Sequence, residues 1–177
     1  MFSTIVKYGL IAGLVVCVPL FSIILIIGCN PASPWSMAVG YLTMLIALST
    51  VFLAIKQIRD RLLGGVIGFW RALGIGIGVS AVAGVFYVLA WDLTCAIGHL
   101  DFADNFANAM IANEKAKGVT GPALTAYVAE MEQFKQQYAN PLWRWPMSFL
   151  EIFPVGLLVS LIAAALLRNP RFLTARG

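Results

Sequence analysis

SFLEIFPVGLLVSLIAAALL (residues 148–167) is an almost unbroken apolar run that contains a single carboxylate, Glu151. About 20 consecutive apolar residues are enough for an α-helix to cross the hydrocarbon core of a bilayer. An ionised side chain within such a helix costs at least a few kcal/mol, so it usually faces protein or water. The stretch therefore predicts a membrane-spanning helix, and Glu151 becomes the first candidate for a functional group.

The composition of the whole chain agrees with a membrane protein. Of 177 residues, 60% are hydrophobic and only 11% are charged, whereas soluble domains are about half apolar and about a quarter charged. The net charge of +4 is modest, and the basic residues do not cluster on one soluble face. We therefore expect no nucleic-acid partner. The composition predicts an all-α, polytopic membrane protein with one membrane domain over residues 1–177.

Three further stretches match the first in length and hydropathy, which predicts four spans in total. All four should be helices, because a backbone in lipid must satisfy its polar groups within its own segment. No internal repeat relates the first two spans to the last two. The predicted spans are residues 8–27, 37–55, 72–91 and 147–167.

The segment of about residues 99–141 is the most polar part of the chain and is expected to lie outside the membrane. Its pattern predicts two helices separated by Gly118 and the pair Gly121-Pro122, and the second carries an amphipathic stripe from Leu124 to Tyr138. Two interpretations stay open. The helices form a hairpin on the outer ends of the spans or on the lipid surface, or they form a cap that captures a ligand or a partner.

The distribution of Lys and Arg predicts the orientation, because cytoplasmic loops are enriched in these residues. Both termini are expected in the cytoplasm. The basic loop KQIRDRLLGG (56–65) would then contact anionic headgroups or dock a cytoplasmic partner. Eight basic residues are then cytoplasmic and four lie outside: Lys7, Lys56, Arg59, Arg61, Arg71, Arg168, Arg171 and Arg176, against Lys115, Lys117, Lys135 and Arg144.

Two acids are expected near the outer surface of the membrane. Glu151 lies four residues after the start of its predicted span, which is about 6 Å along a helix, and Asp92 follows the outer end of the third span. At similar depth they could share a proton or bind a cation. Arg144 lies on the segment that enters the fourth span and is a third member of this candidate polar site. Alternatively, both acids are structural residues near water.

Small residues on the third span predict close helix packing. Gly76, Ser80 and Gly84 form a small-xxx-small face, which lets helices approach within a bundle or in a dimer. A possible facing surface on the second span is Gly40, Thr43, Ala47 and Thr50. The glycines of GIGIGVSAVAG do not predict a nucleotide site, because that motif requires a preceding strand in a soluble βαβ unit.

The cysteine and histidine pattern predicts no metal centre and no cofactor. No CxxC spacing occurs, and a site from Asp92, His99 and Asp101 is a remote alternative. Cys29 and Cys95 both fall near the outer side and could form a disulfide in an oxidising compartment. Cys29 also ends an IIGC stretch that loosely resembles a lipobox, but the preceding apolar run is longer than a signal segment, so we expect a retained span.

Six stretches together resemble a bacterial membrane family known only as domain of unknown function 4199. The resemblance runs nearly end to end and implies a small, four-span protein of the bacterial inner membrane, with a polar segment before the last span and no assigned activity. The stretches are KYGLIAGL (7–14), GYLTMLIALSTVFLAIKQIRD (40–60), GGVIGFWRALGIG (64–76), YVLAW (87–91), MEQFKQQYANP (131–141) and FLEIFPVGLLVSLIAAALLR (149–168).

Three function classes remain open from the sequence. The favoured class is a non-catalytic accessory or assembly protein, whose partners are the bilayer and either a second copy or another membrane protein. The second class is a small, oligomeric transporter or ion-coupled carrier that uses Glu151 and Asp92. The third is a membrane enzyme that acts on lipid, although we find no Ser/His/Asp arrangement, phosphate-binding loop or paired-His motif.

Overall fold

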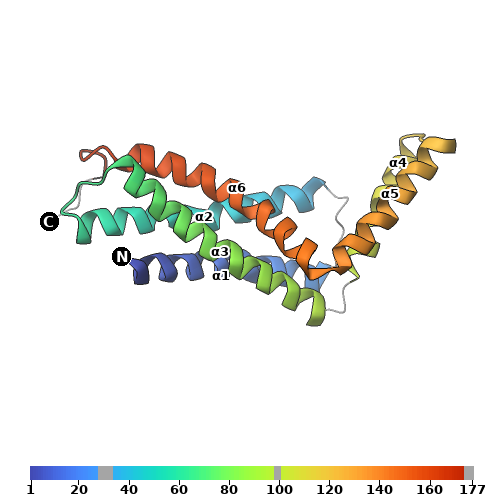
Figure 1. Ribbon diagram of the computed structural model, residues 1–177, viewed down its shortest axis with the longest axis horizontal. Helices are drawn as coiled ribbons and strands as arrows, with labels where there is room; N and C mark the ends of the chain where they lie inside the picture. Colours follow the sequence, from blue (N-terminus) through green and yellow to red (C-terminus); the bar gives the residue numbers. More distant parts are fainter. Residues whose placement is uncertain (28–33, 98–100, 174–177) are drawn as a thin grey trace.

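The computed structural model describes residues 1–27, 34–97 and 101–173. Within these ranges the chain forms six α-helices and no strand, which confirms the predicted all-α class (Figure 1). Four of the helices are long and apolar enough to cross a membrane. In chain order the helices are α1 (Phe2–Ile27), α2 (Pro34–Leu62), α3 (Phe69–Ile97), α4 (Phe102–Ala116), α5 (Gly121–Ala139) and α6 (Pro141–Leu167).

The four long helices, α1, α2, α3 and α6, form one elongated bundle (Figure 1). The start of α1 and the end of α6 lie at the same end of it. The pair α4 and α5 forms a hairpin that projects obliquely from the opposite end, where α5 leads into α6 (Figure 1). The hairpin therefore extends away from the bundle instead of lying flat across the ends of the spans.

Glycines end the helices where the sequence predicted breaks. Gly64 and Gly65 follow α2 with φ angles of 63° and 88°, and Gly118 has a φ of 85° between α4 and α5. Side chains disfavour this left-handed region, whereas glycine adopts it readily. The helices are longer than the predicted spans: α2 reaches Leu62 and α6 starts at Pro141. Hydropathy drops at the first charged residues, whereas a helix continues until a helix-breaking residue ends it.

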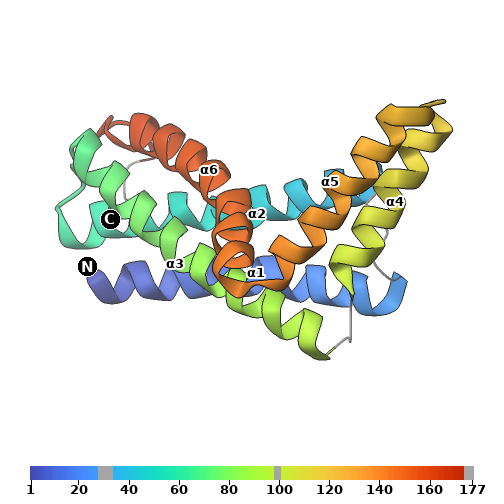
Figure 2. The same ribbon diagram turned by 45° about the vertical axis from the view of Figure 1, so that its right-hand side comes forward.

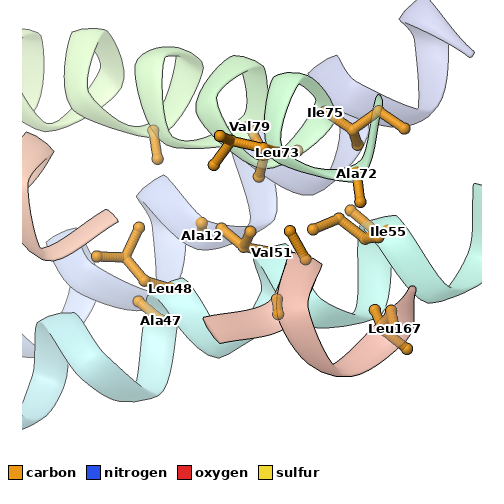
Figure 3. Packing of buried hydrophobic residues seen from close by; sticks show 14 of the residues in the cluster. Ala12, Ala47, Leu48, Val51, Ile55, Ala72, Leu73, Ile75, Val79 and Leu167 are labelled. Atoms are coloured by element: carbon orange, nitrogen blue, oxygen red, sulfur yellow. The ribbon is translucent and has the colours of Figure 1, made fainter. Parts of the chain in front are cut away.

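The centre of the bundle is α3. In its candidate span 56% of the residues are buried, against 28–33% in the other three spans. Apolar side chains from all four long helices meet beside it, and Figure 3 shows Val51 and Ile55 of α2 near Ala12 of α1 and Val79 of α3. Leu167 of α6 joins the same cluster. The packing of the core therefore depends on how closely the other long helices can approach α3.

Two glycines of α1 bring this helix against α3. A Cβ atom added at Gly9 would lie 2.5 Å from Cβ of Val82, and one added at Gly13 would lie 2.6 Å from the Phe86 ring. The spacing is the Gly-xxx-Gly pattern of closely packed membrane helices. Gly9 and Gly13 were not among the predicted packing residues, although their spacing is visible in the amino-acid sequence.

The face of Gly76, Ser80 and Gly84 packs against α6. A Cβ at Gly76 would lie 2.6 Å from Oγ of Ser160, and one at Gly84 would lie 2.7 Å from the Phe149 ring. Oγ of Ser80 lies 3.4 Å from Oγ of Ser160. The facing surface proposed on α2 is therefore wrong for these glycines, and Gly40 has no heavy atom within 4 Å of an added Cβ.

Pro154 lies inside α6. It cannot donate the backbone hydrogen bond that a helix needs at this position, which typically bends the helix. In Figure 2 the early part of α6 runs at an angle to its later part. The bend lets α6 follow α3 through the bundle and still meet the base of the hairpin.

The contrast between two neighbouring glycines of α3 tests this packing. Gly76→Ala should lower the free energy of unfolding by about 1–3 kcal/mol, because the added methyl overpacks the contact with Ser160. Gly74→Ala is the matched control: an added Cβ there meets nothing within 4 Å, so the change should be neutral or stabilising by up to about 1 kcal/mol. Chemical denaturation in detergent measures both, and equal effects would contradict the assignment.

Candidate functional site

The polar side chains of the hairpin end meet at Asp92, near the end of α3. Its Oδ1 accepts a hydrogen bond from Nε of Arg144 at 2.8 Å, and its Oδ2 accepts one from Nε1 of Trp145 at 2.6 Å. Both donors belong to the first turns of α6. Each carboxylate oxygen therefore has a donor, and the ion pair ties α3 to the start of α6.

The sharp turn between α5 and α6 positions these donors. Asn140 separates the two helices, and its side-chain oxygen accepts a hydrogen bond from the Leu142 amide at 3.0 Å, which caps α6. Pro141 then takes the first helical position, where its missing N–H is not needed. Arg144 and Trp145 are thereby held on the first turns of α6.

Arg144 also contacts the end of α5. Its guanidinium carbon lies 5.8 Å from the centroid of the Tyr138 ring, and Nη1 donates to the Tyr138 carbonyl at 3.5 Å. Cation–π contact and charge-assisted hydrogen bonding act together here. One side chain thus joins α3, α5 and α6.

Aromatic rings extend this cluster along the hairpin. Nε1 of the buried Trp91 donates to the Tyr138 hydroxyl at 2.6 Å. The Phe102 ring of α4 packs edge-on against Trp91 with a centroid distance of 5.1 Å, and lies 5.4 Å from the Tyr138 ring. Phe106 and Phe134 continue the contacts between α4 and α5. The hairpin is therefore held to the bundle at its base.

Burial raises the pKa of Tyr138 to about 12, from a reference value of about 10. A buried phenolate loses its hydration, so the folded protein favours the neutral phenol. The Tyr138 hydroxyl that accepts the Trp91 hydrogen bond therefore stays protonated in alkaline solution up to about pH 12.

Glu151 has a separate partner. The hydroxyl of the buried Tyr87 donates to Oε2 of Glu151 at 3.3 Å, and the Glu151 side chain is otherwise exposed at the outside of the bundle. Tyr87 lies one helical turn before Trp91 on α3. The same helix therefore supplies the partner of Glu151 and the tryptophan of the aromatic cluster. This hydrogen bond is how α6 accommodates its carboxylate.

The candidate residues thus divide into two contacts. Asp92 is brought to Arg144, and Glu151 is brought to Tyr87. Sequence reasoning named Asp92, Arg144 and Glu151, but it did not select Tyr87, Trp91 or Tyr138. The clustering of aromatic residues around YVLAWD and at the end of the amphipathic stripe was the available indication.

The remaining candidates do not form a second site among the described residues. Cys29 and His99 lie outside the described ranges, so the Cys29–Cys95 disulfide stays a prediction, and Cys95 itself is half-buried on α3. Asp101 is exposed just before α4. In the described ranges no three His, Cys, Asp or Glu side chains gather where they could hold a metal ion.

At the other end of the bundle, one of the basic residues predicted to be cytoplasmic is fully buried. Arg59 of α2 is 0% exposed, and it donates to the carbonyls of Phe172 and Leu173 at 2.9 and 2.7 Å. Its Nε donates to Oδ1 of Asp60 at 2.7 Å. Arg59 therefore satisfies carbonyls that follow α6 and are without helical partners.

Comparison with protein families gives one result. The family model described as protein of unknown function (DUF4199) matches residues 7–169. No curated protein and no solved structure matches the chain.

Removing the charge of Asp92 tests the contact at the hairpin base. Asp92→Asn should lower the free energy of unfolding by about 1–3 kcal/mol, because Arg144 loses its anionic acceptor. Asp104→Asn is the matched control, since Asp104 is the exposed member of the Asp104–Lys135 pair on the hairpin, and such a pair should contribute at most about 1 kcal/mol. Denaturation in detergent measures both variants. A loss for Asp92→Asn no larger than for Asp104→Asn would refute the structural role.

Stability at alkaline pH tests the environment of Tyr138. Because its pKa is raised to about 12 by folding, the associated stabilisation is complete below about pH 10 and is lost as the pH rises toward 12. The parent protein should therefore lose unfolding free energy more steeply over this range than Tyr138→Phe. Tyr127→Phe, on the same helix, should follow the parent. Parallel curves for the parent and Tyr138→Phe would contradict the prediction.

Proposed function

This chain belongs to the DUF4199 family of proteins of unknown function, and from that premise we propose that it is a non-catalytic accessory or assembly protein of a membrane. Its four apolar helices are compatible with a multi-pass protein in a lipid environment. We further propose the bacterial inner membrane as its location. In this proposal both termini are cytoplasmic, as the excess of basic residues at their end of the bundle suggests, and the hairpin of α4 and α5 lies outside.

The observation that carries this proposal is the state of Asp92. Both of its carboxylate oxygens accept hydrogen bonds, from Arg144 and from Trp145. A carboxylate that serves as a carrier or acid–base group must exchange protons or ligands during its cycle. Asp92 instead holds the start of α6 against α3, which supports a structural role.

The shape of the hairpin supports a partner at this end. The hairpin projects from the bundle (Figure 1). Its aromatic seam, the row of rings that includes Phe106 and Phe134, is turned inward between α4 and α5. Polar residues such as Glu130 and Gln133 are exposed. A polar, projecting hairpin is suited to contact another protein in water. It lacks a broad apolar face with which to lie on lipid.

A small, ion-coupled carrier is the second candidate, and the observation in its favour is Glu151. This carboxylate is exposed on a membrane-spanning helix, with Tyr87 as its hydrogen-bond partner. Intramembrane acids often mark proton or ion pathways. A lipid-acting enzyme is the third candidate, for which the same two acids would be the reactive groups.

Site-specific photocrosslinking in membranes of the native host tests the accessory role. A photoreactive residue at Glu130 or Gln133 should give a discrete adduct with another membrane protein, because these exposed positions lie on the projecting hairpin. The matched control is Leu45 or Ile46, which are exposed on α2 and should yield lipid adducts.

Reconstitution in proteoliposomes tests the same proposal against transport. Glu151→Gln keeps an oxygen that accepts the Tyr87 hydrogen bond, so it should change the free energy of unfolding by less than about 1 kcal/mol. We also expect no difference in proton or cation flux from the parent. A flux that the parent supports and Glu151→Gln abolishes, together with no protein adduct at Glu130 or Gln133, would replace the accessory role with the carrier.

A further inference from the structure

The end of the bundle where α1 starts and α6 ends has an excess of positive charge. On one short stretch of α2, Lys56, Arg59 and Arg61 stand against the single acid Asp60, which leaves two positive charges in excess. Four further basic residues lie near this end: Lys7 in the first turns of α1, Arg71 at the start of α3, and Arg168 and Arg171 just after α6. An anion close to this end would therefore be attracted.

The only acid in this stretch is already engaged. Oδ1 of Asp60 accepts from the buried Arg59 at 2.7 Å, and Oδ2 accepts from Nζ of Lys56 at 2.6 Å. Because Arg59 is fully buried, its ion pair draws the Asp60 carboxylate toward the interior of the bundle. Lys56 has two remaining N–H donors, since an ammonium group carries three.

A cavity of about 240 Å³ opens beside these groups, between α1 and α2. Six residues line it: Tyr8, Leu53, Lys56, Gln57, Asp60 and Arg61. The Tyr8 hydroxyl donates to Oε1 of Gln57 at 2.5 Å and joins the two helices across the cavity. This leaves the Gln57 amide nitrogen as a further donor.

The donors available around the cavity suit an anionic oxygen group. The guanidinium of Arg61 is on an exposed residue and forms no hydrogen bond or ion pair with the residues that the structure describes. A guanidinium fork binds phosphate oxygens in pairs, and an ammonium binds them as a point charge. The volume is below that of a typical drug-sized site, but a headgroup phosphate fits within it.

We propose that this cavity binds the phosphate group of an anionic phospholipid, with Lys56 and Arg61 as the principal ligands. The cavity lies at the end of a membrane-spanning helix, and the outward side of α2 next to it is apolar, with Leu53 both lining the cavity and 50% exposed. The acyl chains would follow this apolar side while the phosphate enters between α1 and α2. Basic pockets between membrane helices bind anionic lipid headgroups by this chemistry.

Lipid binding to the purified full-length protein in a neutral detergent tests the proposal by native mass spectrometry. Phosphatidylglycerol should bind about tenfold more tightly than phosphatidylcholine, whose headgroup has no net charge. The double variant Lys56→Gln/Arg61→Gln should lose about tenfold in affinity for phosphatidylglycerol. The matched control Lys115→Gln/Lys117→Gln removes the same charge from the hairpin and should bind like the parent. Equal binding by both double variants, or equal binding of the two lipids by the parent, would overturn the site.

Two further measurements keep the test decisive. Arg61→Gln alone changes an exposed residue and should still weaken phosphatidylglycerol binding severalfold, even if the loss of the Lys56–Asp60 pair unfolds the double variant. Glycerol 3-phosphate and inorganic phosphate are added as soluble competitors. If they displace the lipid only in large molar excess, the source is the bilayer; equal potency would assign the same phosphate site to a soluble compound. Failure of Arg61→Gln to weaken binding would refute the site.

Discussion

The bundle is held together by the close approach of α3 to α1 on one side and to α6 on another. Helices in lipid gain little from hydrophobic association, so packing at small residues must hold them together. Gly9 and Gly13 admit Val82 and Phe86 on one side, and Gly76 and Gly84 admit Ser160 and Phe149 on another. If α1 and α6 moved away from α3, the core side chains in Figure 3 would lose their packing contacts with α3.

Polar contacts complete the bundle at each end, where the small-residue contacts do not reach. At the hairpin end, Asp92 binds Arg144 and Trp145, and Tyr138 connects this pair to the aromatic seam of α4 and α5. At the other end, Arg59 binds carbonyls that follow α6. A buried charge is tolerable only when it is paired and hydrogen-bonded, and the fully buried Arg59 meets that condition through Asp60 and these carbonyls. The ends of α6 are therefore positioned by charge, and its middle by packing.

This distribution of charge bears on function. Asp92, whose two carboxylate oxygens both accept hydrogen bonds, lies where the projecting hairpin joins the bundle. This position suits an element that must keep a fixed angle while it contacts a partner. The opposite end combines an occupied acid with unoccupied donors around a cavity. A protein bound to lipid at one end and to a partner at the other would couple the membrane surface to an assembly without any chemical step. Glu151, held by Tyr87 alone among the described contacts, is the group on which a carrier role would depend.

The four apolar helices, the breaks at Gly64–Gly65 and Gly118, the acid at the outer end of the third span and the acid within the fourth could all be predicted from the amino-acid sequence. These follow from local chemistry, since hydropathy, chain length and the φ preference of glycine act within a few residues. Four features became visible only once the helices were packed together: Arg144 pairs with Asp92, Tyr87 holds Glu151, Gly76 faces α6, and Arg59 is buried. Each of these contacts joins residues far apart in the chain. Their partners depend on the rotation and crossing of whole helices, which a linear pattern does not contain.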